Sequence, residues 1–289
     1  MSTKHMHYVP ECYLKPFSYI KDRSDHIDFI RKNEEIKSAS IKGMCVRTKL
    51  YKLEVTDPKY DSLYLENFFH KFFENNYNNI YKNLIKSRAS SITDKQRIEL
   101  IGWCTHLFYR NNDYYQKLTQ RYLEHSKNLE LLMRQTVDKD LYQEFMKLYQ
   151  ISEKEIKRLT KLLFHNTLLS SSCILLINLI RHGIIIVEAK TESGFLTCDN
   201  PVNIRLEISA SNNSNTYYLQ VPLDDKHLLL LSPSNNNKSN NEIQWIKGDE
   251  ITVGAANLNC HRNSEEYLIG KRYNIEKYFE FYKDFQNAI

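Results

Sequence analysis

The sequence predicts an α+β fold in which N- and C-terminal strands form a mainly antiparallel sheet around a central helical bundle. Short extended runs of apolar residues occur over residues 7–55 and return over 184–289, whereas residues 62–183 repeat their apolar positions every three or four residues. The order strands, helices, strands is typical of α+β domains. Because no internal repeat or proline-rich linker divides the 289 residues, we expect a single domain over 1–289.

The N-terminal region is predicted to be a small antiparallel sheet or hairpin. The runs "YLKPFS" and "HIDFIRK" are separated by the polar segment "YIKDRSD". In "VRTKLYKLE", Val46, Thr48 and Leu50 alternate as they would on one face of a strand.

Helical periodicity begins at Ser62. In "LYLENFFHKFFENNYNNIYKNLIKS" leucine, phenylalanine and isoleucine recur at helical spacing and form one broad apolar stripe. Thr93 and Gln96 have the spacing of a capping box, which predicts a second helix that runs towards Met133 and is bent or split near Asn111.

A third helix is expected to follow, opened by the capping box of Ser152 and Glu155 and ended by Gly183. It contains the longest apolar run, "LLFHNTLLSSSCILLINLI", over residues 162–180. Histidine, asparagine and serine interrupt this run, so we expect a buried central helix and not a membrane span.

The C-terminal region is predicted to return to strands, in "IIIVEAK", "GFLTCDNPVNI", "TYYLQVPL" and "HLLLLSP". The tracts "SASNNSN" and "SPSNNNKSNN" lack apolar residues and are expected to be loops. Two short helices are expected to close the chain, from Asp249 to Leu258 and from Asn274 to Gln286.

Composition excludes several classes of protein. The net charge of +5 comes from scattered charges of both signs, so nucleic acid is an allowed partner and only weakly favoured. The six cysteines are single and spread, which favours reduced thiols in the cytoplasm over a four-cysteine zinc site. The sequence also lacks a glycine-rich phosphate loop, a G-x-S-x-G elbow and an H-E-x-x-H motif.

Two histidines near the N-terminus are the first candidates for chemistry. His5 and His7 point to the same side of an extended segment, where they could bind one metal ion or one phosphate, or where one could act as a base. The alternative is a pair of exposed terminal histidines. Asp199, in "TCDNPV", is either a strand-ending turn residue or a catalytic acid.

A polar stripe on the second helix is the next candidate. Glu99, Trp103, His106 and Arg110 are spaced by four, three and four residues, which places them on one face. This face is either a pocket lining or a solvated, salt-bridged surface. Glu66 and Glu74 on the preceding helix are similar. Basic residues interleaved with aromatics, as in "KRYNIEKYFEFYK", allow stacking on nucleic-acid bases or belong to a solvated helix.

Six motifs together resemble a bacterial family known as domain of unknown function 4238. They are "HMHYVPECYLKPFS", "YLENFFHKFFE", "HLFYRN", "FLTCDNPV", "VPLDDKHLLLLSP" and "NLNCHRNSEEYLIG", in the family's order and over nearly the whole chain. Met6 stands where the family has the first histidine of its His-His-Tyr-Val-Pro signature, and Cys198 stands where serine is usual. The resemblance marks these residues: His7, Tyr8, Val9, Pro10, Leu14, Phe17, Glu66, Arg110, Asp199, Asn200, Pro201, Pro222 and Leu223.

The resemblance implies a site built from four separate segments. We expect His7 and Asp199 to converge, Glu66 to supply a second carboxylate and Arg110 to bind an anionic oxygen. The predicted ligand-binding residues are Tyr8, His106 and Asn200, and the candidate metal ligands are His5, His7 and Asp199.

Such a site suits metal-assisted or acid–base hydrolysis of phosphodiesters. We therefore expect a nuclease-like cytoplasmic enzyme, and bacterial defence against phage is one role that such an enzyme could have. The cofactor is open, a divalent metal being compatible with the residues. One alternative is a binding module that holds an anionic ligand, a nucleic acid or a protein partner without breaking a bond. Another is a structural role in which His7 would bond Asp199 and fix the N-terminal segment to the C-terminal strands.

Overall fold

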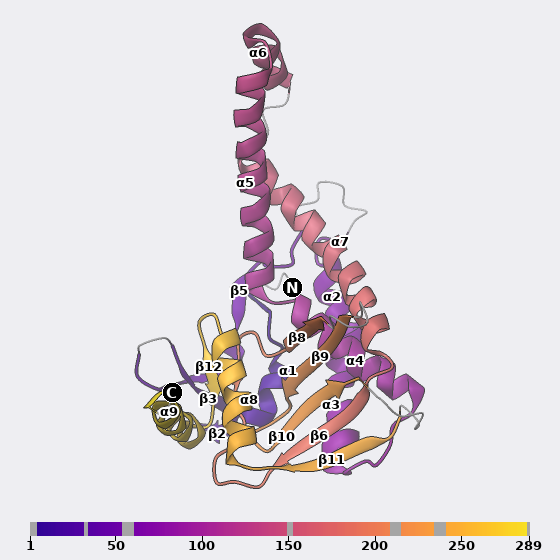
Figure 1. The fold of residues 1–289 in the computed structure, drawn as a ribbon, viewed down its shortest axis with the longest axis vertical. Coiled ribbons are helices and arrows are strands. Elements are labelled where there is room, and N and C mark those ends of the chain that lie inside the picture. Colours follow the sequence, from indigo (N-terminus) through magenta and orange to yellow (C-terminus); the bar gives the residue numbers. More distant parts are fainter. Residues whose placement is uncertain are drawn as a thin grey trace.

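Strands from the two ends of the chain lie side by side in a computed structural model that describes residues 5–31, 34–53, 61–148, 153–208, 215–233 and 241–287. One sheet has the order β2-β3-β12-β7, with β4 paired to β3, and joins N-terminal β2 and β3 to C-terminal β7 and β12. A second sheet has the order β11-β6-β10-β9-β8, and β1 pairs with β5. The expected sharing of a sheet by both ends is therefore confirmed (Figure 1).

The N-terminal elements are short. They are β1 (His5–His7), α1 (Glu11–Leu14), a 3₁₀ turn (Lys15–Phe17), β2 (Tyr19–Lys21), β3 (Ser24–Ile30), β4 (Lys37–Ser40), a 3₁₀ turn (Ile41–Gly43) and β5 (Val46–Thr48). The expected strand in "YLKPFS" is wrong, because this segment is helical: Pro16 lies in the first turn of the 3₁₀ helix, where no backbone N–H is needed.

The next helical segment is continuous from Tyr64 to Lys86 but not regular. It consists of α2 (Tyr64–Phe69), a π-helical segment (His70–Glu74), α3 (Asn75–Tyr81) and a second π-helical segment (Lys82–Lys86). The following helix, α4 (Asp94–Tyr109), has the predicted capping box, with Thr93 and Gln96 each bonding the other's backbone N–H. The predicted break near Asn111 is confirmed, since Asn111 caps the N-terminus of α5.

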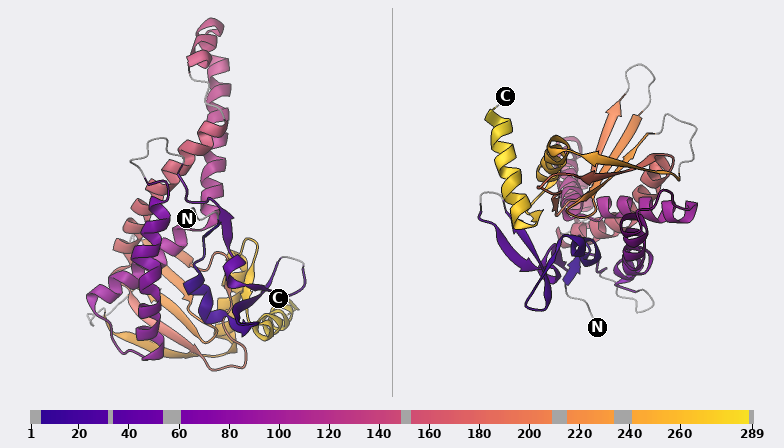
Figure 2. Two further views of the ribbon diagram at one scale, coloured as in Figure 1. Left: turned by 180° about the vertical axis from the view of Figure 1, so that it is seen from behind. Right: turned by 90° about the horizontal axis from the view of Figure 1, so that it is seen from below.

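Long helices project from the rest of the molecule (Figures 1 and 2). They are α5 (Asn112–Thr136), α6 (Lys139–Leu148), which was not predicted, and α7 (Glu153–Leu179). We call the projecting part, α5, α6 and residues 153–163 of α7, the arm, and the remainder of the described residues the body.

The helix α7 is less buried than predicted. It ends at Leu179, and Gly183 instead begins the next strand. Residues Lys157–Leu179 are long and apolar enough to cross a membrane by length and composition, and 33% of the most apolar window is buried. One side of α7, with Phe164, Leu168 and Leu175, packs in the core, so the helix is half-buried and not central.

The C-terminal elements follow the predicted order with two added strands, β11 and β12. They are β6 (Gly183–Ala189), β7 (Thr197–Cys198), β8 (Asn203–Ile208), β9 (Asn215–Pro222), β10 (His227–Ser232), β11 (Ile243–Gly248), α8 (Glu250–Asn263), β12 (Leu268–Gly270) and α9 (Arg272–Asn287). Asp249 caps α8 as expected. The unpredicted β11 pairs in parallel with β6 at the sheet edge. Residues 209–214 and 234–240 of the expected asparagine-serine loops lie outside the described residues.

The N-terminal segment is fixed in the core. Met6, Val9, Tyr13 and Phe17 are fully buried, and the Tyr13 hydroxyl lies 2.7 Å from Thr197 Oγ1 and donates to the carbonyl of Pro222 at 2.8 Å. These contacts join the first residues of the chain to strands that follow almost 200 residues later. As a result, β1 has a defined position and brings His7 to the helical layer.

Candidate functional site

The buried guanidinium of Arg110 is the centre of the site. Arg110 is 3% exposed and follows the last turn of α4. Its Nη1 donates to Glu74 Oε1 at 2.5 Å, and its Nη2 donates to the backbone carbonyl of His7 at 2.5 Å. Glu66 Oε2 lies 3.7 Å from the same Nη2. Three segments that are distant in sequence therefore meet at one cation, and we call His7, Glu66, Glu74 and Arg110 the Arg110 cluster.

Aromatic rings enclose the guanidinium. It lies 4.5 Å from the ring centre of Phe69 and 5.1 Å from that of Tyr51. The Tyr51 hydroxyl donates to the Arg110 carbonyl at 2.7 Å and accepts from Arg110 Nε at 3.3 Å. Because carboxylates, a carbonyl and ring faces all favour the cation, Arg110 remains charged in spite of its burial.

The π-helical segment His70–Glu74 explains why Glu66 and Glu74 can share this cation. The two residues are eight positions apart, whereas two turns of α-helix take about seven residues. A π segment adds one residue to a turn and thereby aligns positions eight apart. The irregular helix thus places both carboxylates on the face that meets α4.

The two carboxylates differ in acidity. Burial raises the pKa of Glu66 above its usual value, and Arg110 offsets this only in part. Burial also opposes the ionisation of Glu74, but its hydrogen bonds and charge contacts with Arg110 and His70 hold its pKa below the usual value. A pair of carboxylates whose pKa values are moved apart is the arrangement in which one serves as an acid while the other stays ionised.

His7 lies beside these groups with a free ring nitrogen. Its Nε2 is buried and makes no hydrogen bond with any part of the chain that the structure describes, and Glu11 Oε1 lies 3.5 Å from it. Burial, together with the charge of Arg110, lowers the pKa of His7, although Glu11 opposes this. His7 is therefore neutral near pH 7, and its Nε2 is able to accept a proton.

The four residues of the polar stripe predicted on the second helix do not share one environment. Glu99 is 4.0 Å from Lys95 on the surface, whereas Trp103 stacks on Tyr77 in the core with ring centres 4.3 Å apart. His106 is buried with its ring centre 3.9 Å from that of Phe73, and burial, followed by the Arg110 charge, lowers its pKa to about 3. His106 is a neutral core residue next to the cluster.

Asp199 has a structural position instead of the predicted one beside His7. Its carboxylate is buried and accepts backbone N–H bonds from Glu265 at 2.9 Å, Glu266 at 2.7 Å and Tyr267 at 3.3 Å. Burial nevertheless raises the pKa of Asp199. Among the described residues no hydrogen bond or ion pair joins His7 to Asp199, so the expected convergence is not found and Asp199 instead fixes the turn before β12.

The other predicted ligand-binding residues also hold the fold. Tyr8 is buried, and its backbone N–H donates to the carbonyl of Cys45 at 2.9 Å. Asn200 accepts from Asn111 Nδ2 at 3.1 Å and so links the strand end to the cap of α5. These residues do not line the Arg110 cluster.

The candidate metal ligands do not fit a metal centre. His5 is exposed on β1, His7 faces the Arg110 cluster, and Asp199 has its oxygens occupied by backbone N–H groups. Within the parts of the chain that the structure describes, no three His, Cys, Asp or Glu side chains are grouped so that they could hold a metal ion.

Sequence reasoning missed two contributors to the site. Glu11 lies within the opening motif, four residues after His7, but His7 is on a strand and Glu11 begins a helix, so no periodic spacing predicted their contact. Tyr51 offered no signal, because its role depends on a loop that returns to α4.

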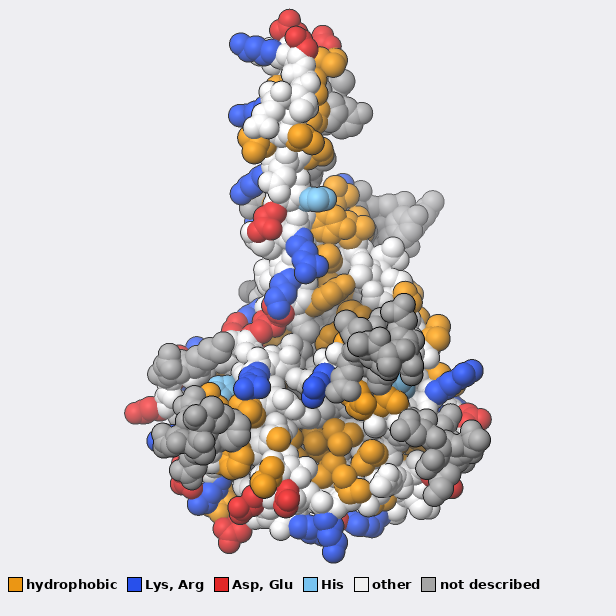
Figure 3. Space-filling model, viewed as in Figure 1, with side chains coloured by type: hydrophobic (Ala, Val, Ile, Leu, Met, Phe, Trp, Pro, Cys, Tyr) orange, Lys and Arg blue, Asp and Glu red, His pale blue; other side chains and the backbone are white. Residues whose placement is uncertain are grey.

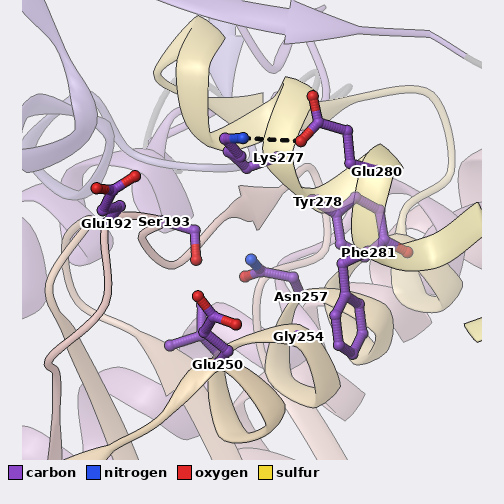
Figure 4. A pocket seen from close by; sticks show the side chains of 10 residues that line it. Glu192, Ser193, Glu250, Gly254, Asn257, Lys277, Tyr278, Glu280 and Phe281 are labelled. Atoms are coloured by element: carbon purple, nitrogen blue, oxygen red, sulfur yellow. Dashed lines mark hydrogen bonds and ion pairs between the residues drawn. The ribbon is translucent and has the colours of Figure 1, made fainter. Parts of the chain in front are cut away.

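A hollow of about 260 Å³ lies elsewhere, between α8, α9 and residues 192–193. Figure 4 shows Glu250, Ser193 and Asn257 around it, with Lys277 paired to Glu280 at 2.8 Å. None of the predicted site residues lines this hollow.

Comparison with known proteins gives one result. A family model described as a protein of unknown function (DUF4238) matches residues 5–274, a range that includes the whole Arg110 cluster. No curated protein and no solved structure matches the chain.

Proposed function

The chain belongs to the DUF4238 family, and we propose that its Arg110 cluster is a hydrolase site that cleaves RNA phosphodiester bonds by general acid–base catalysis. The observation that carries the proposal is that one buried arginine contacts both the backbone carbonyl of His7 and the carboxylate of Glu66, a group of raised pKa. The neutral ring of His7 has an Nε2 without a hydrogen-bond partner among the described residues. A base and an acid held together are the two groups that such a reaction requires.

Each residue has a distinct part in the proposed reaction. His7 Nε2 takes the proton from a ribose 2′-hydroxyl, whose oxygen attacks phosphorus. As the P–O2′ bond forms and the P–O5′ bond breaks, the protonated carboxyl of Glu66 gives its proton to the leaving O5′, and a 2′,3′-cyclic phosphate is left. Water then opens this cyclic phosphate, with Glu66 as base and His7 as acid, which completes the hydrolysis and restores both residues. Arg110 is a positioning residue and not the predicted anion ligand, because its nitrogens already hold Glu74 and the His7 carbonyl.

Glu11 controls access in this proposal. Its carboxylate lies 3.5 Å from His7 Nε2, an atom that solvent does not reach, while 42% of the Glu11 side chain is exposed. A substrate hydroxyl would take the place of this carboxylate. The six cysteines are free, which agrees with action in the reducing bacterial cytoplasm. The proposed substrate there is RNA of the host or of a phage, and the proposed role is defence.

The test is incubation of purified wild type and variants with RNA and with DNA of the same sequence. We expect wild type to cleave RNA but not DNA, which lacks the 2′-hydroxyl. The His7→Ala and Glu66→Gln variants should be at least about 100-fold slower. His5→Ala, on the same strand, and Glu99→Gln, at the surface, are matched controls that should retain full activity.

The pH dependence adds a second readout. Because the base must be deprotonated and the acid protonated, the rate should rise as His7, whose pKa is lowered, loses its proton and should fall as Glu66, whose pKa is raised, ionises, so that the profile is bell-shaped. Equal RNA cleavage by wild type and a folded His7→Ala protein would overturn the proposal, as would the absence of cleavage by wild type at every pH at which it is folded.

A further inference from the structure

The arm exposes apolar side chains that a folded chain normally buries. Eighteen large apolar side chains are exposed among the described residues, and eight of them lie on the arm. They are Tyr122, Leu129, Leu131, Leu132, Leu141, Leu159, Leu162 and Leu163. Contiguous exposed apolar surface of this kind marks an interaction site in a soluble protein.

Part of this surface is a groove between two helices. Leu129 and Leu132 of α5 and Leu159 and Leu163 of α7 line it together with Tyr122, and its volume is about 590 Å³. The α5 residues recur at three- and seven-residue spacing, and the α7 residues at four. Such spacing is typical of a helical seam that packs against another helix.

Charge is distributed unevenly along the arm. From Asp113 to Lys127, near the body, α5 has three basic side chains and two acidic ones, and Asp113 pairs with Lys117. From Asp138 to Glu144, at the tip, there are three acidic side chains and one basic one. Figure 3 shows acidic side chains at the tip and apolar ones between the tip and the body.

We propose that the arm is a dimerisation element that packs antiparallel against the arm of a second copy of this chain. In that arrangement the acidic tip of each arm meets the basic root of the other, and the two leucine-rich middles cover one another. A two-fold axis makes both contacts identical, which is the usual symmetry of a homodimer. The 25 residues of α5 span about 37 Å, which allows a long contact.

A membrane fits this surface less well than a second copy. Although α7 contains a stretch of suitable length, α5 lies against it and has seven charged side chains in 25 residues. A lipid interior would have to take up those charges. In contact with a second arm, the charged side chains of α5 would stay in water or form ion pairs.

The first experiment measures mass in solution by size-exclusion chromatography with light scattering at micromolar concentration. Wild type should have twice the monomer mass of 34.4 kDa. The double variant Leu129→Glu/Leu163→Glu should be monomeric, while Ile251→Glu, at an exposed apolar position on α8 outside the arm, should remain dimeric. Circular dichroism checks that each variant is folded, and Leu129→Gln/Leu163→Gln replaces the glutamate variant if it is not.

The second experiment tests the antiparallel direction by charge exchange. Arg121→Glu at the root and Asp140→Lys at the tip should each weaken the dimer. The double variant should restore it, because the two reversed charges then meet across the axis. Failure of the double variant to restore the dimer would contradict the antiparallel arrangement.

A monomeric wild type overturns the proposal. If that monomer floats with phospholipid vesicles, the apolar surface belongs to a membrane contact instead. Dimer mass does not depend on catalysis, so this result is independent of the RNA-cleavage assay.

Discussion

The Arg110 cluster and the arm depart in opposite ways from the usual distribution of side chains. In the body, a guanidinium and two carboxylates lie largely out of water and bind one another. On the arm, leucines lie in water with few neighbours. Buried charge and exposed apolar surface both reduce the stability of an isolated chain. The two destabilising features therefore lie in separate parts of the molecule. We infer a catalytic site at the buried charges and a dimer contact at the exposed leucines.

The largest expected difference between the two regions concerns their arginines. Arg110→Met should lower the free energy of unfolding by about 3–5 kcal/mol, because Glu66 and Glu74 would lose their buried counterion. Arg134→Met should have no measurable effect, since the Arg134 ion pair with Glu130 on the arm is exposed. Urea denaturation of both variants checks this, and equal stabilities would remove the distinction between cluster and arm.

The next difference concerns two leucines of α7. Leu168→Ala should cost about 2–5 kcal/mol, because the side chain is fully buried and its removal leaves a cavity. Leu162→Ala, 44% exposed on the arm, should change the stability of the single chain by less than about 0.5 kcal/mol in dilute solution. A large loss from Leu162→Ala under those conditions would show that the arm packs against its own chain.

Most of the fold could be predicted from the sequence, because periodicity and caps are local signals. The capping box at Thr93 and the break at Asn111 are examples. The missed strand β11 is short, with apolar Ile243, Trp245 and Ile246 after an asparagine-rich tract, and what defines it as a strand is its pairing with β6, more than 50 residues earlier. No local signal contains such a pairing.

The site could be predicted only in part, because its contacts join segments that are distant in the sequence. Glu66 and Arg110 were identified, but Asp199 was expected beside His7. Tyr8, the residue after β1, and not His7, is the one whose pKa the Asp199 charge helps to raise, after burial and Cys45. The helix alone did not show that a π segment would bring Glu74 to Arg110.

Buried His106 makes the stability of the body depend on pH. Its folded-state pKa of about 3 lies below the unfolded value of 6.5, so the stability that it contributes is present above pH 6.5 and is lost as the pH falls. Between pH 7 and pH 5 this loss should be about 2 kcal/mol. His106→Leu should remove that part of the acid sensitivity, measured by urea denaturation at both pH values.

The smallest expected effect lies where the arm leaves the body. Burial, followed by the charges of Asp199 and Asp113, raises the pKa of Glu265 to about 7, although a backbone hydrogen bond at Asp113, in the first turn of α5, and the charge of Lys117 oppose this. A raised pKa means that the stabilising state is protonated, so stability is lost as the pH rises through 7. Wild type should therefore lose about 1 kcal/mol between pH 6 and pH 8 from this group. Glu265→Gln should abolish that loss, as thermal unfolding at the two pH values would show. Glu266→Gln, the neighbouring residue, is the matched control, and an equal response of both variants would mean that the root of α5 does not depend on the protonation of Glu265.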